Sequence, residues 1–180
     1  MLALRIASAG ALAAIGAHGA RANPGLPAKA IKATYLYKLP DFVQWPAGAL
    51  PPGEFILCVI GEPVLGDALD RTIAGQTTQR RPIRLRRYPT VAQNPGCQMV
   101  FASGSQAQPV AAILQLVRGA PVLTVTDEQQ APGSIGIINF IVVDGRVRFE
   151  VDRDAARVNQ LAISSKLLTL AVRVRGRTVP

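Results

Sequence analysis

Apolar residues along this chain fall mainly in short runs bounded by turn residues, a pattern that predicts buried strands alternating with helices. The clearest run spans residues 54–61 (EFILCVIG), where six consecutive apolar residues end in glycine and follow a Leu-Pro-Pro-Gly turn. A short apolar run between turn signals is typical of a strand buried on both faces, in the middle of a parallel sheet covered by helices. A tight turn and a short helix around residues 64–73 should follow, which is the βα step of a doubly wound fold.

Residues 28–46 have a helical pattern before this strand. One helical face carries four apolar residues: Ile31, Tyr35, Leu39 and Phe42. Lys29, Lys32 and Asp41 fall elsewhere on the helix. Pro40 should kink the helix or split it into two short ones, and Pro46 should end it.

The rest of the chain continues the α/β pattern. Residues 81–88 alternate as a half-exposed strand near an edge, and 97–102 and 121–126 are apolar strands on either side of a helix that residues 103–105 open. Asp144-Gly145 between two apolar runs predicts a β-hairpin of residues 135–143 and 146–151. Asp152 and either Ser164 or Ser165 are expected to cap two short helices, and residues 172–177 alternate again. We therefore expect an α/β fold: a doubly wound, mostly parallel sheet flanked by helices and ending in an antiparallel β-hairpin.

The first 22 residues have the features of a secretory signal peptide. An Ala-rich apolar run follows Arg5, and Ala20-Arg21-Ala22 is an A-x-A cleavage signature. The run is too short to span a bilayer. We expect residues 1–22 to be a signal peptide, residues 23–180 to form a single domain, and the mature protein to be soluble outside the cytoplasm.

Charge and composition limit the classes of function that the chain can have. The only histidine, His18, would leave with the signal peptide, which excludes Ser-His-Asp catalysis and His-bearing zinc sites from the mature chain. The formal charge of +9 would fall by two, through loss of Arg5 and Arg21. A net positive charge can favour binding to nucleic acid, to a membrane surface or to an acidic partner. It can also belong to a surface that only contacts solvent. Aromatic residues are few and do not interleave with the basic ones, so we expect no nucleic-acid partner.

The two cysteines, Cys58 and Cys97, are predicted to form a disulfide. Both fall in predicted strands that a doubly wound order can place side by side, at a spacing that suits a disulfide. An exported protein meets an oxidising compartment. Two buried free thiols or a reversible redox pair are the alternatives.

Several residues could contact a partner, and each of them also has an alternative explanation in which it only stabilises the fold. Trp45-Pro46 could contact a partner, or Trp45 could pack under the edge of the sheet. Arg84 and Arg86 lie in the densest basic segment, which could attract an anionic partner or guard an edge strand against aggregation. Asn139, polar among apolar neighbours, could line a site or satisfy a backbone group.

An ordered set of motifs covers nearly all of the mature chain: residues 32–38 with 42–46, 57–61, 66–69, 96–101, 121–127, 136–140, 145–151 and 164–168. With these motifs the chain resembles the YfiR-like family of periplasmic proteins. The resemblance implies a periplasmic repressor that binds the periplasmic domain of an inner-membrane diguanylate cyclase, lowers cyclic-di-GMP signalling, is sequestered by an outer-membrane lipoprotein and forms a homodimer. We expect the contact to include Tyr35, Phe42, Trp45 and Pro46 on the first helix and its end, with Arg84 and Arg86 contributing electrostatically.

Two other functions remain open from the sequence. The first is a periplasmic small-ligand-binding sensor domain, with its site in the loops after Gly61, Ser103 and Asp127 at the carboxyl ends of strands. The second is an enzyme that uses Asp67, Asp127 or Glu150, although no spacing singles out a catalytic pair. We expect no enzyme activity, no cofactor and no metal.

Overall fold

An eight-stranded sheet forms the centre of the molecule, which is described by a computed structural model over residues 25–176. The strand order is β10-β8-β7-β6-β5-β2-β4-β3. β2 (Phe55–Gly61), β4 (Arg81–Tyr88), β5 (Met99–Gly104), β6 (Leu123–Asp127) and β7 (Ile138–Val143) run parallel. The predicted doubly wound, mostly parallel sheet is confirmed, whereas the predicted signal peptide lies outside the described residues.

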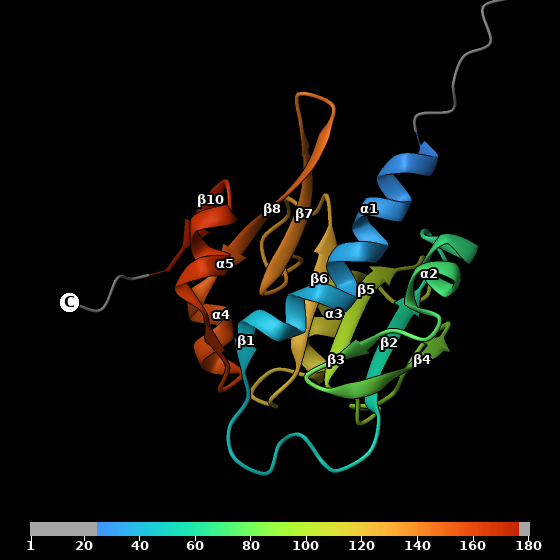
Figure 1. Cartoon of the computed structure of the whole chain (residues 1–180). Helices are drawn as coiled ribbons and strands as arrows, with labels where there is room; N and C mark the ends of the chain where they lie inside the picture. Colours follow the sequence, from blue (N-terminus) through green and yellow to red (C-terminus); the bar gives the residue numbers. More distant parts are fainter. Residues whose placement is uncertain (1–24, 177–180) are drawn as a thin grey trace, which may run out of the picture.

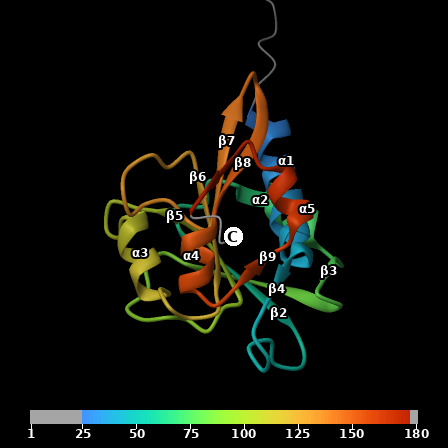
Figure 2. The same cartoon turned by 90° about the vertical axis from the view of Figure 1, so that its left-hand side faces the viewer.

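Helices cover both faces of the sheet (Figure 1, Figure 2). α1 (Gly25–Lys38) and α2 (Gly66–Ile73) pack on one face, and α3 (Val110–Leu116) packs on the other. α4 (Arg153–Val158) and α5 (Ser165–Leu170) lie at the end of the sheet that carries β8 and β10. Phe55, Leu57 and Val59 face the larger core while Cys58 and Ile60 face the smaller one, so β2 is buried on both sides as predicted.

The N-terminal helical segment is split at Pro40, as predicted. α1 ends at Lys38, a 3-10 turn η1 (Leu39–Phe42) carries the proline near its start, and β1 (Val43–Gln44) follows. β1 pairs with β9 (Ala162–Ile163) in a separate two-stranded sheet. The predicted buried face was partly wrong, because Ile31 is 44% exposed while Lys32 is buried.

The predicted hairpin is confirmed. β7 pairs antiparallel with β8 (Arg146–Asp152), and Asp144 and Gly145 both have positive φ, at 49° and 70°, as a two-residue type I′ turn requires. The hairpin projects beyond the neighbouring strands (Figure 1). It is not the edge of the sheet, because β10 (Arg173–Arg175) adds a parallel strand beside β8.

The remaining boundaries differ in small ways from the sequence expectations. Cys97 lies just before β5, which begins at Met99, and α3 begins at Val110 after Pro109 rather than after residues 103–105. The caps are as expected: the Asp152 side chain accepts from the Ala155 N–H and the Ser164 side chain accepts from the Leu167 N–H. A two-residue strand, β3 (Thr77–Thr78), pairs with the first residues of β4.

Candidate functional site

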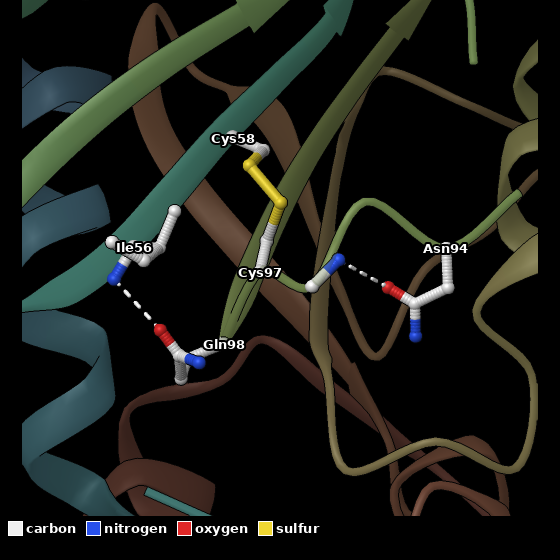
Figure 3. Close-up of a disulfide and its surroundings, with 6 residues drawn as sticks. Ile56, Cys58, Asn94, Cys97 and Gln98 are labelled. Carbon is white, nitrogen blue, oxygen red and sulfur yellow. Dashed lines mark hydrogen bonds between the residues drawn. A yellow bond between two sulfur atoms is a disulfide. The ribbon is translucent and has the colours of Figure 1, made fainter. Parts of the chain in front are cut away.

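A disulfide joins the centre of the sheet to the loop before β5 (Figure 3). Cys58 on β2 bonds Cys97, with 6.0 Å between their Cα atoms, and both side chains are buried. The Gln98 side chain accepts a hydrogen bond from the Ile56 N–H at 2.8 Å, and the Asn94 side chain accepts one from the Gly96 N–H at 3.0 Å. The loop is therefore tied to β2 by a covalent bond and a hydrogen bond, and the predicted disulfide is confirmed.

The carboxyl ends of β2 and β5 meet at two glycines. Gly61 and Gly104 both have positive φ, and the Glu62 N–H donates to the Gly104 carbonyl at 2.8 Å. The Ser103 hydroxyl lies 3.1 Å from the Ile60 carbonyl and 2.7 Å from the Glu62 carbonyl. This is where doubly wound folds bind ligands, and an open hollow of about 500 Å³ lies there, lined by Gly61, Glu62, Pro63, Pro89, Thr90, Ser105, Gln106 and Ala107.

A charge cluster under α1 occupies the third expected ligand loop. Lys32 Nζ lies 2.6 Å from Asp127 Oδ1, 2.9 Å from Asp127 Oδ2 and 3.2 Å from Glu128 Oε1. Burial raises the pKa of the Asp127 carboxyl above its ordinary value, against the opposing effect of Lys32. Because its acids are engaged by Lys32, the cluster holds α1 against the carboxyl end of β6.

A second ion-pair cluster attaches β10 to the sheet. The Glu150 side chain is only 5% exposed, and its two oxygens lie 2.8 Å from Arg173 Nη1 and 2.9 Å from Arg175 Nη2. Both arginines are thus held over the buried carboxylate of the neighbouring strand. Glu150, a candidate acid in the sequence, is engaged in fastening the edge strand.

The aromatic candidates near the N-terminus pack into the core with part of each side chain accessible. The Tyr35 ring lies 5.8 Å from Phe140 and 5.6 Å from Phe149, centroid to centroid, and Phe42 is half-buried. The Trp45 ring stacks edge-on against Phe55, and its Nε1–H donates to the Pro121 carbonyl at 2.9 Å. These contacts match the structural explanation for Trp45, and Pro46 beside it is half-buried.

The outward side of α1 carries an apolar hollow. It has a volume of about 380 Å³ and is lined by Ala30, Ile31, Thr34 and Tyr35. Ile31 is 44% exposed, and Val142 on the projecting hairpin is 48% exposed. Tyr35 is the one sequence candidate that lines this hollow.

The two candidate arginines on β4 differ in their surroundings. Arg84 forms a salt bridge with Glu54, with Nη2 2.9 Å from Oε1, and the hydrogen bonds of this pair lower the pKa of Glu54 and raise the pKa of Arg84. Arg87, which was not among the predicted contact residues, pairs with Asp70 at 2.6 Å. Arg86 is exposed and has no carboxylate partner among the residues that the structure describes.

The six candidate residues do not form one site. Tyr35 lies on α1, Phe42, Trp45 and Pro46 follow at its end, and Arg84 and Arg86 lie on β4 near the far edge of the sheet (Figure 1). Lys32 was missed, since a lysine in an amphipathic helix normally indicates the solvent side. The acidic pair Asp127-Glu128 at the end of a buried strand was the available signal that a buried cation lies nearby.

Within residues 25–176, no helix is long and apolar enough to cross a bilayer. The same part of the chain has no group of three or more histidine, cysteine, aspartate or glutamate side chains placed to hold a metal ion. Asn139 is buried, and its side chain bonds both the N–H and the carbonyl of Gln129 and accepts from the Thr126 hydroxyl. It satisfies backbone groups, as the structural explanation expected.

Comparison with known proteins supports the resemblance inferred from the motifs. No curated protein matches the chain significantly. Residues 29–172, from early in α1 to the residue before β10, match the family described as YfiR/HmsC-like, which is a regulatory rather than a catalytic family. Because this match covers most of the chain, including the disulfide, the hairpin and the cluster of Lys32 with Asp127 and Glu128, the protein belongs to the YfiR/HmsC-like family.

Proposed function

We propose that this protein is a periplasmic regulatory binding protein that represses an inner-membrane diguanylate cyclase through the cyclase's periplasmic region. The family match over residues 29–172 is the observation that carries the proposal. The use of Asp127 and Glu150 in ion pairs that hold α1 and β10 supports a binding role over a catalytic one. The disulfide suits an oxidising compartment.

Repression requires a difference in affinity. A regulator that binds the active and inactive conformations of a cyclase equally tightly shifts neither, whereas one that prefers the inactive conformation increases its population. In this proposal the repressor acts as a homodimer, and an outer-membrane lipoprotein relieves repression by sequestering it.

The proposed cyclase contact is centred on the apolar hollow of α1. Ile31 and Tyr35 offer apolar surface there, and exposed apolar surface of this kind marks protein contacts. Phe42, Trp45 and Pro46 extend the surface from the end of α1, while Arg84 and Arg86 act at a distance through their charge. Trp45 contributes only the part of its ring that Phe55 leaves accessible.

Deletion in the native host tests the function. Loss of the gene should raise cyclic-di-GMP, and the rise should disappear when the cyclase is deleted as well. Complementation with Ile31→Asp should fail to restore repression, whereas Val64→Asp, a change at a valine of comparable exposure (39%) outside the hollow, should restore it. An unchanged nucleotide pool in the deletion strain, with the cyclase expressed, would refute the proposal.

A small-ligand sensor is the second candidate, and the hollow at the ends of β2 and β5 favours it. Its position, where the strand order reverses on either side of β2, is the usual ligand site of a doubly wound sheet. A thermal-shift screen of small molecules distinguishes the two functions. A ligand that raises the melting temperature, and loses this effect when Thr90→Trp fills the hollow, would favour the sensor.

A further inference from the structure

Three exposed apolar side chains gather in five residues near the end of the described chain. Leu170 at the end of α5 is 62% exposed, Val172 is 48% exposed, and Val174 in β10 is 41% exposed. Leu170 has the highest exposure among the large apolar side chains of residues 28–176. Single exposed apolar residues are ordinary, but a cluster of them indicates a contact surface.

This cluster lies on an open edge of the sheet. β10 pairs in parallel with β8 through Arg173, Val174 and Arg175, and no other strand of residues 25–176 pairs with its outer side. An edge strand presents unpaired N–H and C=O groups to which a further strand can bond. The backbone and the apolar side chains thus offer two kinds of contact at the same place.

The two faces of β10 differ in chemistry. Arg173 and Arg175 both reach Glu150, so they share one face of the strand. Because successive side chains of a strand point to opposite faces, Val174 lies on the other face, and the exposed Val172 comes immediately before the strand. An added strand would therefore meet an apolar face and a basic face.

The charge at this edge bears on the occupant. Arg173 and Arg175 share Glu150, and Asp152 lies in register with Arg175, whereas Arg173 is 64% exposed and so remains accessible to a further carboxylate. In a second copy pairing antiparallel about Val174, Arg173 of one chain would lie opposite Arg175 of the other, and like charges directly opposite each other destabilise a strand pair. An acidic strand would instead place a carboxylate against the exposed Arg173.

The opposite edge of the sheet differs in its side chains. β3 covers only the first residues of β4, and of the exposed arginines that follow, Arg84 and Arg87 pair with Glu54 and Asp70. Ile83 and Leu85 pack against the larger core. The charged side chains along that edge discourage another strand from pairing with it, as they do in natural sheets.

We propose that the β10 edge binds an extended segment of a protein partner by strand addition, and that this segment alternates apolar and acidic residues. Its apolar side chains would cover Val172, Val174 and Leu170, and its carboxylates would reach Arg173 and Arg175. Main-chain hydrogen bonds supply affinity in this mode, and the alternate side chains supply specificity. The site goes beyond the proposed cyclase contact on α1 and does not depend on it.

The test titrates isotope-labelled mature protein with a seven-residue peptide of alternating valine and glutamate, up to about 1 mM, a concentration that detects binding of only about 4 kcal/mol. The amide signals of residues 170–176 should shift, and their hydrogen exchange should slow. A valine–lysine peptide and a valine–glutamate peptide with N-methylated amides should not produce these changes. Binding by the N-methylated peptide would show that the backbone of the added strand makes no bonds and would overturn strand addition.

A matched pair of variants locates the site. Val174→Asp places a like charge against the acidic peptide and should weaken binding at least about tenfold, a loss equivalent to 1.4 kcal/mol. Val64→Asp, at a valine of 39% exposure just before α2 and away from β10, should leave binding unchanged. Equal weakening by both variants, no shift at 1 mM, or peptide-free dimerisation that protects residues 170–176 would overturn the proposal, the last by assigning the edge to a second copy.

Discussion

At the scale of single residues, two carboxylates that are largely removed from solvent each help to attach one element to the sheet. Asp127 holds α1 through Lys32, and Glu150 holds β10 through two arginines. Such pairs are expensive to break from the buried side, because an unpaired buried charge loses its solvation without compensation. The two carboxylates therefore yield distinct predictions.

Replacing Glu150 should loosen β10 without unfolding the core. In Glu150→Ala two charge-assisted hydrogen-bond partners are lost, and the free energy of unfolding should fall by about 1–3 kcal/mol. Amide exchange should accelerate at residues 173–175 before it does so in β2. Glu54→Ala removes the exposed partner of Arg84 and should have a much smaller effect. Equal effects of the two substitutions on chemical denaturation would contradict this role of Glu150.

Asp127 should make the protein less stable as the pH rises. Since burial raises its pKa in the folded state, the folded protein binds this proton more tightly than the unfolded chain does. The associated stability is fully present below the ordinary aspartate pKa and is lost as the pH rises through the higher folded-state pKa. Relative to Asp127→Asn, the wild-type free energy of unfolding should thus decline across that interval.

Denaturant unfolding of both proteins at a series of pH values measures this difference, and NMR titration of the Asp127 carboxyl gives the pKa itself. A wild-type stability that rises relative to Asp127→Asn over the same interval would mean that the attraction of Lys32 outweighs burial.

At the scale of elements, the disulfide ties the loop before β5 to the central strand β2. It closes 39 residues of chain, which in the chain-entropy view contributes about 4 kcal/mol. Cys58→Ala with Cys97→Ala should lower the free energy of unfolding by an amount of this order, measured by denaturation without reductant. Intact mass after alkylation of the denatured wild-type protein checks the bond, since two alkylated cysteines would contradict it.

Local patterns in the sequence predicted those elements whose cause is local. The apolar run of β2, the split at Pro40 and the Asp144-Gly145 turn each depend on a few neighbouring residues. The buried position of Lys32 depends on carboxylates 95 and 96 residues away, so helical periodicity placed it on the wrong face. β10 was predicted only as an alternating segment, because its place in the sheet depends on Glu150.

The candidate contact residues show the same division. The motifs located Tyr35 on the helix that carries the apolar hollow, but they did not indicate Ile31 as its exposed neighbour. Arg84 and Arg86 looked equivalent, since sequence alternation does not reveal that Glu54 reaches only the first.

At the scale of the whole molecule, the basic charge should act on the rate at which partners meet. The formal charge of +9 makes the chain strongly basic, and exposed charges mainly alter association rate and its salt dependence. Arg84→Glu and Arg86→Glu should each slow association with the proposed cyclase partner at low salt, because each replaces a positive charge by a negative one. Stopped-flow rates across ionic strengths measure this, and identical rates for both variants and wild type would leave these arginines as a solvated edge.

The bond between Cys58 and Cys97 also closes a covalent ring of polypeptide that includes two of the eight strands of the sheet. α2, β3 and β4 all lie between the two cysteines. A peptide bond cut by a protease in the exposed turn at Gly75-Gln76 would open that ring without dividing the molecule. On a denaturing gel, the cleaved protein would migrate as one band without reductant and as two bands after reduction. A single cleavage between the two cysteines therefore leaves both fragments joined by the disulfide.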